Sequence, residues 1–125
     1  MDNRAVRENE GKPRWGLVDF KSLEPMVQVL EFGAEKYDDN NWKKGLKYVG
    51  VCESLLRHVH AFLRGENKDP ESGISHIGHI QCNAMFLDYM VKNHSDLDDR
   101  YKTPSTKLIW LGKKSKASSS KSISL

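Results

Sequence analysis

Residues 49–93 read VGVCESLLRHVHAFLRGENKDPESGISHIGHIQCNAMFLDYMVKN, and this stretch sets the fold class. Over about residues 49–64, apolar side chains recur three or four positions apart, which is typical of the buried face of an α-helix. Gly65 follows as the glycine that commonly ends a helix. Over about residues 74–93, a second helical pattern is apolar on nearly every side, as in a helix buried in a bundle or at a subunit interface. The loop between them is short and turn-forming, so we expect the two helices to run antiparallel.

A third helical pattern lies earlier in the chain, over about residues 24–37. Ser22 is a candidate N-cap for this helix, and Pro25 suits its first turn, where the missing N–H of proline costs nothing. A short apolar patch at 108–111 is a candidate fourth element. The sequence therefore predicts an all-α fold: a small bundle of three main helices plus a short fourth element, completed by oligomerisation.

The length of 125 residues suits one domain and is too short for two ordinary ones. We expect a folded domain over residues 11–95, a polar connection with the apolar patch over 96–111, and a disordered Ser/Lys-rich tail over 112–125. The formal net charge of +3 comes from this tail, which holds four lysines and no acid and leaves 16 basic against 17 acidic residues elsewhere. The overall charge is therefore poor evidence that the fold binds nucleic acid.

The sequence also carries expectations about location. No apolar run approaches the ~18–20 residues of a membrane span, and the first residues lead into charge rather than into an apolar signal segment. Cys52 and Cys82 lie within helical patterns and not in a Cys-x-x-Cys motif, so we expect buried thiols in a reducing compartment. These features predict a soluble, cytoplasmic protein without a membrane partner.

Side chains of the types that bind metals crowd around the loop between the two later helices. They are His58, His60, His76 and His79 together with Glu66, Asp69 and Glu71. In antiparallel helices, His58, late in one helix, can face His76 or His79, early in the next. Imidazoles combined with carboxylates suit Mn²⁺, Fe²⁺ or Zn²⁺, whereas carboxylates alone suit Mg²⁺. The alternative is a set of neutral core histidines bonded to carboxyl or carbonyl groups, and the sequence leaves both interpretations open.

Glu31 and Glu35 form a second candidate pair, four residues apart on the first helix. Adjacent carboxylates repel one another unless a cation or a proton intervenes, so they could share a divalent ion. The alternative is an ordinary solvated helix face.

Four basic residues are candidate anion contacts: Lys12, Arg14, Lys36 and Arg57. A glycine and a proline hold the first two in a stiff loop, which suits phosphate better than a flexible tail does. Taken singly, each is an ordinary surface charge. Beside a metal site they become candidates for binding phosphate, because phosphoryl transfer needs cations on several sides of the reacting group. Trp15 and Trp42 lie in expected loops, where either ring could stack on a nucleobase or plug a small core.

Several motifs are absent, namely a Walker loop, Gly-x-Ser-x-Gly, Cys-x-x-Cys and a His-Asp doublet. Five segments that are present occur in a telling order: GKPR at 11–14, FGAEKY at 32–37, NW at 41–42, RH at 57–58 and GExxDxESGxxHxxH at 65–79. Together they resemble the phage-associated dATP/dGTP diphosphohydrolase N-terminal domain family, which is related to the MazG-like all-α nucleoside triphosphate pyrophosphohydrolases. The resemblance covers about residues 11–91.

The resemblance implies cleavage of a purine deoxynucleoside triphosphate, dATP or dGTP, between its α- and β-phosphates. The products would be the monophosphate and pyrophosphate, and the reaction would need Mg²⁺ or Mn²⁺. Burial of the apolar helix at about 74–93 separately predicts a homodimer or homotetramer. A phage-encoded member would work in the host cytoplasm. MazG-like enzymes carry their metal ligands on a Glu-Glu-x-x-Glu helix and a later Glu-x-x-Asp helix. This chain departs from that pattern: at the positions of the Glu-x-x-Asp motif it carries His76 and His79 in place of the two carboxylates.

These considerations give an expected site. Its metal ligands are Asp69, Glu71, His76 and His79, with Glu31 and Glu35 as second choices. Glu71 and His58 are the expected catalytic groups, which would help to deprotonate a metal-bound water. Lys12, Arg14, Lys36 and Arg57 would bind phosphate. Asn41 and Trp42 would hold the base, since an amide can read both donor and acceptor edges.

Two other interpretations stay open. The chain could be a catalytically inactive helical module of a phage replication system that binds nucleotide or protein, with purely structural histidines. It could also be a nucleic-acid accessory protein that uses its lysine-rich tail.

Overall fold

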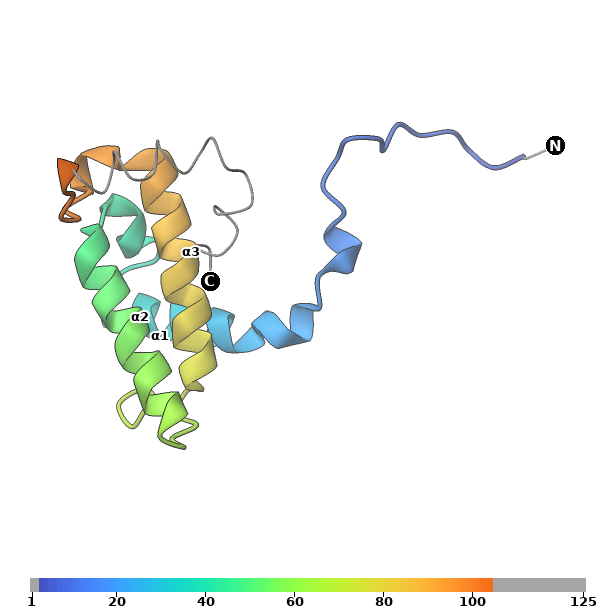
Figure 1. Ribbon diagram of the computed structural model, residues 1–125. Helices are drawn as coiled ribbons and strands as arrows, with labels where there is room; N and C mark the ends of the chain where they lie inside the picture. The colour runs from blue at the N-terminus through green and yellow to red at the C-terminus, as the bar shows by residue number, and fades with distance from the viewer. Residues whose placement is uncertain (1–2, 105–125) are drawn as a thin grey trace.

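The computed structural model describes residues 3–104, and in that range the chain is helical (Figure 1). The α-helices are α1 (Glu24–Lys36), α2 (Tyr48–Leu63) and α3 (His76–Asn93). The short 3-10 helices are η1 (Trp15–Leu17), η2 (Phe20–Leu23), η3 (Asn41–Lys44) and η4 (Ser95–Leu97). The described residues contain no strand beyond one isolated bridge, between Lys68 and Ser75, and no helix long and apolar enough to cross a membrane. The predicted all-α fold is confirmed; the patch at 108–111 and the tail at 112–125 lie outside the described residues.

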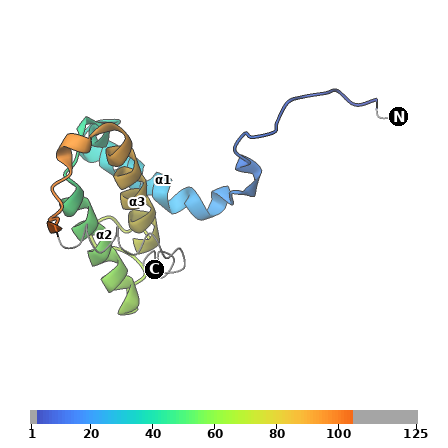
Figure 2. The same cartoon turned by 45° about the horizontal axis from the view of Figure 1, so that its top comes forward.

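Helix α3 is the centre of the bundle and packs against both other helices. It lies beside α2 in the two ribbon views, and α1 crosses it on another side (Figure 1, Figure 2). Gly78 permits the close approach of α1, because a Cβ added there would lie 2.6 Å from the carbonyl oxygen of Pro25. The buried hydrophobic residues of this small core are Tyr48, Val51, Ala61, Cys82 and Met90.

The ends of the helices show which of the caps predicted from local sequence patterns are present. Pro25 lies in the first turn of α1, as predicted. The prediction of Ser22 as N-cap is wrong: residue 23 holds that position, because η2 runs directly into α1 and the Ser22 hydroxyl bonds instead to the Asp19 carboxylate. Gly65 follows α2 with a φ of 94°, the left-handed conformation that glycine adopts readily. Helix α3 starts two residues later than expected, where the Ser75 hydroxyl accepts the N–H of Ile77 at 3.1 Å.

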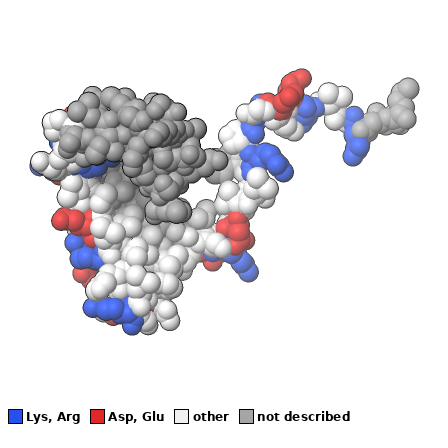
Figure 3. All heavy atoms as spheres, in the orientation of Figure 1, with Lys and Arg blue, Asp and Glu red and all other residues white. Residues whose placement is uncertain are grey.

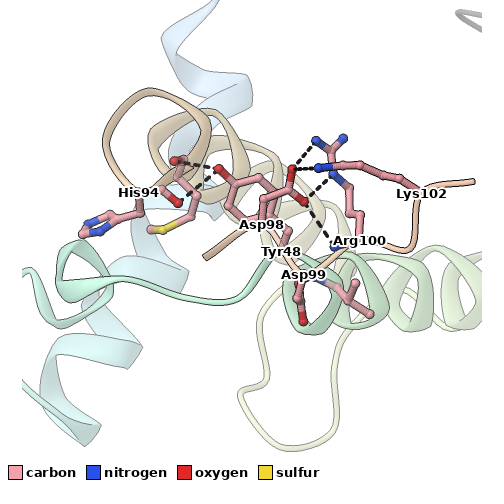
Figure 4. Close-up of polar contacts among 8 residues, drawn as sticks. Tyr48, His94, Asp98, Asp99, Arg100 and Lys102 are labelled. Carbon is pink, nitrogen blue, oxygen red and sulfur yellow. Dashed lines mark hydrogen bonds and ion pairs between the residues drawn. The ribbon is translucent and has the colours of Figure 1, made fainter. Parts of the chain in front are cut away.

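The segment 94–102 closes the end of the bundle opposite the loop between α2 and α3, and we call it the clasp (Figure 4). The Tyr48 hydroxyl lies 3.0 Å from the carbonyl oxygen of Met90 and 3.2 Å from that of His94. Asp99 caps α2 from outside the helix, by accepting the N–H of Val49 at 2.9 Å. The start of α2 is thereby joined to the end of α3.

Neighbouring basic groups complete the clasp. Arg100 lies over the Tyr48 ring at 5.5 Å, and it also donates to the Asp98 carboxylate at 2.8 Å. Lys102 donates to the same carboxylate at 2.8 Å. These hydrogen bonds hold the pKa of Asp98 well below its usual range.

The N-terminal arm, residues 3–22, is joined to the bundle at Ser22, whose carbonyl accepts from the Gln81 amide at 2.9 Å, and its earlier part extends into solvent (Figure 1, Figure 2). Three large apolar side chains on it are mostly exposed: Trp15, Leu17 and Phe20. The space-filling view shows the arm standing clear of the body, with basic and acidic groups along it (Figure 3).

Candidate functional site

Two histidines from different helices meet beside the loop that joins α2 to α3. The Nδ1 atoms of His58, on α2, and His76, at the start of α3, lie 2.8 Å apart. The other ring nitrogen of His76, Nε2, lies 2.7 Å from Oε1 of Glu66, and the imidazole is 2% exposed. A carboxylate only accepts, so Nε2 of His76 carries a proton and donates it. In the neutral ring Nδ1 is then a bare acceptor that faces His58.

His79 adds a second imidazole to the side of His58. The two rings are stacked, with centroids 4.3 Å apart and planes 5° from parallel. Nε2 of His79 lies 2.7 Å from the Ser72 hydroxyl. Burial lowers the pKa of His58 and of His79. Both rings are thus kept in the neutral form, which is the form that binds metal ions.

Asp69 is presented by the turns of the same loop. Its Oδ2 accepts the backbone N–H of Ser72 at 2.9 Å, and its backbone N–H bonds to the carbonyl of Ile74 at 2.9 Å. Burial raises the pKa of Asp69, but the hydrogen bonds from Ser72 and the neighbouring His79 and His58 together outweigh it, and the net pKa is lowered. Gly73, with a φ of 72°, lets the loop turn back toward α3.

Three of these residues can offer one ligand atom each to a single ion. The donor atoms of His58, Asp69 and His76 lie within 4.8 Å of one another, and we call these residues the histidine cluster. A set of two imidazole nitrogens and one carboxylate oxygen fits Mn²⁺, Fe²⁺, Co²⁺ or Zn²⁺. Glu66 occupies the supporting position that a carboxylate commonly takes behind a metal-binding histidine.

A cavity of about 630 Å³ opens next to the histidine cluster, a size that suits a small-molecule ligand. His79 contributes to its wall, and so links the cavity to the cluster. Apolar residues of α1, together with Trp42 and Phe86, line much of the rest. The Trp42 ring stacks on Phe86 at 4.7 Å and meets the edge of Tyr89 at 4.8 Å. These two contacts hold the ring in place as part of the cavity wall.

The other residues predicted as metal ligands or metal-binding types lie outside the histidine cluster. Glu71 is exposed, and its Oε1 lies 3.4 Å from Nζ of Lys36. Glu31 lines the cavity and Glu35 is exposed on α1; neither belongs to the histidine cluster. His60 is exposed on α2.

The expected substrate contacts divide into two groups. Lys36 and Asn41 line the cavity, and Arg57 is exposed on α2 next to His58. Lys12 and Arg14 lie on the N-terminal arm instead, which leads away from the cavity of its own chain (Figure 1).

The sequence counted Glu66 only among the metal-binding types near the loop and gave Ser72 no role, although both contact the histidines. Both residues lie in the loop that the sequence marks as acidic and turn-forming. The signal that could have found Glu66 is Gly65 before it, because a left-handed glycine reverses the chain and turns the next side chain back toward the helix. Cys82 is buried as expected, whereas Cys52 is only half-buried.

Comparisons with known proteins agree with this picture. A family model described as dATP/dGTP diphosphohydrolase, N-terminal, matches residues 2–100. A protein of Salmonella phage PMBT28, named dATP/dGTP diphosphohydrolase, is 30% identical over 96 residues, which are 77% of this chain and 33% of the relative. The chain thus spans about a third of the length of the curated relative it matches. No solved structure matches. The relationship to MazG-like enzymes stays a prediction, and the chain belongs to the dATP/dGTP diphosphohydrolase N-terminal domain family.

Proposed function

We propose that this chain is a metal-dependent nucleotide pyrophosphohydrolase domain. It would cleave purine deoxynucleoside triphosphates, dATP or dGTP, to the monophosphate and pyrophosphate. The observation that carries the proposal is the placement of a three-residue set of metal donors beside a cavity of ligand size. Because the phage relative is about three times as long as the matched region, an activity of the whole relative extends to this chain only as a proposal.

The histidine cluster would hold the metal through His58, Asp69 and His76. When bound, the ion would supply positive charge for the phosphates and an activated water. Two imidazoles in the set favour Mn²⁺ over Mg²⁺, since Mg²⁺ prefers oxygen ligands. Glu66 would hold His76 in the tautomer whose Nδ1 is free to bind.

Glu71 is the group we assign as general base. Its charge acts on the pKa of His79, which places it near the histidines, and it is exposed enough to exchange a proton with water. Its ion pair with Lys36 is exposed and easily opened, so Lys36 is free to turn toward a phosphate. Arg57, next to His58, would add a second cation.

The base would enter the apolar part of the cavity. Trp42, already fixed by Phe86 and Tyr89, offers a rigid wall, and the Asn41 amide can pair with both donors and acceptors of a purine.

A product assay tests this proposal. Purified protein is given each of the four deoxynucleoside triphosphates with Mn²⁺ or Mg²⁺, and the products are separated by ion-exchange chromatography. We expect monophosphate and pyrophosphate from dATP or dGTP, and their loss in Asp69→Asn, which keeps a hydrogen-bond acceptor for the Ser72 N–H. Nucleoside plus tripolyphosphate would contradict the reaction type.

One observation favours the inactive binding module as a second candidate. The buried imidazole of His76 already has a partner at each ring nitrogen without any ion. For that module, folded protein would show no turnover with any metal, and Asp69→Asn would leave nucleotide affinity unchanged.

A further inference from the structure

The N-terminal arm has local structure that its own bundle does not explain. The N–H of Leu17 bonds to the carbonyl of Arg14 at 3.0 Å, and that of Val18 to the carbonyl of Trp15 at 3.1 Å. The arm is therefore turned and ordered at these residues, yet it extends away from the helices in both ribbon views (Figure 1, Figure 2).

The apolar side chains of the arm point to a contact with another surface. Trp15, Leu17 and Phe20 are 68%, 72% and 64% exposed, and they lie within six residues of one another. Single exposed apolar residues are common, but a concentrated group of large ones marks an interaction site. The bundle also exposes apolar groups of its own, among them Leu56 and Leu63 on α2, which are 62% and 77% exposed.

The charges around the cavity indicate that the basic residues of the arm could act at a nucleotide site. The charged residues that line the cavity are Lys36, Glu31, Asp38 and Asp39, so carboxylates outnumber the one lysine. A triphosphate carries several negative charges and needs cations on more than one side. One divalent ion, Lys36 and the neighbouring Arg57 would face three carboxylates of the cavity as well as the triphosphate, so the site stays short of positive charge. Lys12 and Arg14 would make up the shortage, but they lie on the arm.

We propose that the N-terminal arm crosses to a second copy of this chain and places Lys12 and Arg14 at the nucleotide site of that copy. The crossing is reciprocal, so that each copy gives and receives one arm and the dimer is closed. The apolar group of Trp15, Leu17 and Phe20 holds the arm in place. The identity of the anion rests on the proposed function, whereas the crossing itself does not.

Light scattering coupled to size-exclusion chromatography tests the crossing. The full chain is expected at twice its formula mass, and the triple variant Trp15→Ser/Leu17→Ser/Phe20→Ser is expected as a monomer. Its helical circular dichroism should be unchanged, because these residues lie outside the core. Val6→Ser is the control, a still more exposed apolar residue of the arm that lies away from the apolar group, and it should stay dimeric. A monomeric wild type, or a dimeric triple variant, would overturn the proposal.

Mixing two defective chains tests where Lys12 and Arg14 act. Lys12→Ala/Arg14→Ala has an intact bundle and a defective arm, whereas Asp69→Asn has an intact arm and a defective cluster. Each alone should be dimeric and inactive. Co-expressed, they should recover about a quarter of the wild-type rate, since half of the dimers are mixed and one of their two sites is complete.

The two possible failures are distinguishable. A co-expressed mixture that stays inactive, beside an active wild type, would show that the arm serves its own chain. A wild type without turnover that is dimeric only when its arm is intact would refute the proposed function and leave the crossing standing.

Discussion

Glu66→Gln should weaken metal binding by the histidine cluster without unfolding the bundle. The Glu66 carboxylate accepts from Nε2 of His76 at 2.7 Å, which fixes the proton on that nitrogen and leaves Nδ1 as the ligand atom. A glutamine amide can donate as well as accept. It therefore permits the other tautomer, in which Nδ1 carries the proton and cannot bind a metal.

The size of the effect follows from the position of Glu66. Replacing a carboxylate that supports a metal-binding histidine typically costs about 10- to 100-fold in affinity. This corresponds to about 1.4–2.8 kcal/mol in the free energy of binding. Glu66 is exposed, so its replacement should have only a small effect on the free energy of unfolding of the metal-free protein.

Titration with Co²⁺, followed by its visible absorption, measures the affinity, and ¹⁵N chemical shifts of the imidazoles identify the tautomer of His76. Glu53→Gln is the matched control, an exposed glutamate on α2 outside the histidine cluster and the cavity lining, and it should leave both readouts unchanged. Unchanged Co²⁺ affinity in Glu66→Gln, with the proton still on Nε2, would refute the reasoning.

Three further changes follow from the fold. Gly78→Ala should lower the free energy of unfolding by about 1–3 kcal/mol, since the new Cβ would lie 2.6 Å from a carbonyl oxygen of α1. At Gly50 an added Cβ would meet no neighbouring atom within 4 Å, so Gly50→Ala should raise the free energy of unfolding by up to about 1 kcal/mol. Thermal denaturation compares the two variants. Asp99→Ala should cost about 1 kcal/mol, because it removes the cap of α2, and urea denaturation measures the loss. Without metal, urea denaturation should show stability falling as the pH drops below 6.5: the unfolded chain then binds protons at His58 and His79, while the lowered pKa of each folded imidazole keeps it neutral. Stability that rises over that range would contradict the last expectation.

Sequence patterns predicted the features that depend on periodicity. The three helices were placed within two residues of their ends, and the short loop was enough to set His58 opposite His76 and His79. Ser22 was misassigned as a cap because a 3-10 turn before α1 offers its hydroxyl a nearer partner, and only the folded turn reveals that competition.

The remaining features depend on where distant side chains meet. The role of Glu66 requires its carboxylate to reach His76, and periodicity says nothing about how a loop turns. Trp42 was predicted to contact the nucleobase of the substrate, and the sequence does not show that its ring also packs against Phe86 and Tyr89 of α3. The direction of the arm, which separates Lys12 from the cavity, is likewise a property of the whole chain.

Cys82 gives the bundle an internal reporter of opening. Its side chain is 1% exposed, and burial raises the pKa of the thiol to about 12. The thiolate is the reactive species, so a thiol-labelling reagent should modify Cys82 only during moments when α3 separates from its neighbours. Cys82 lies on α3 between the histidine cluster and the clasp. Its labelling rate would therefore measure how often the middle of the helix bundle comes apart, and whether a bound ion or nucleotide makes those events rarer.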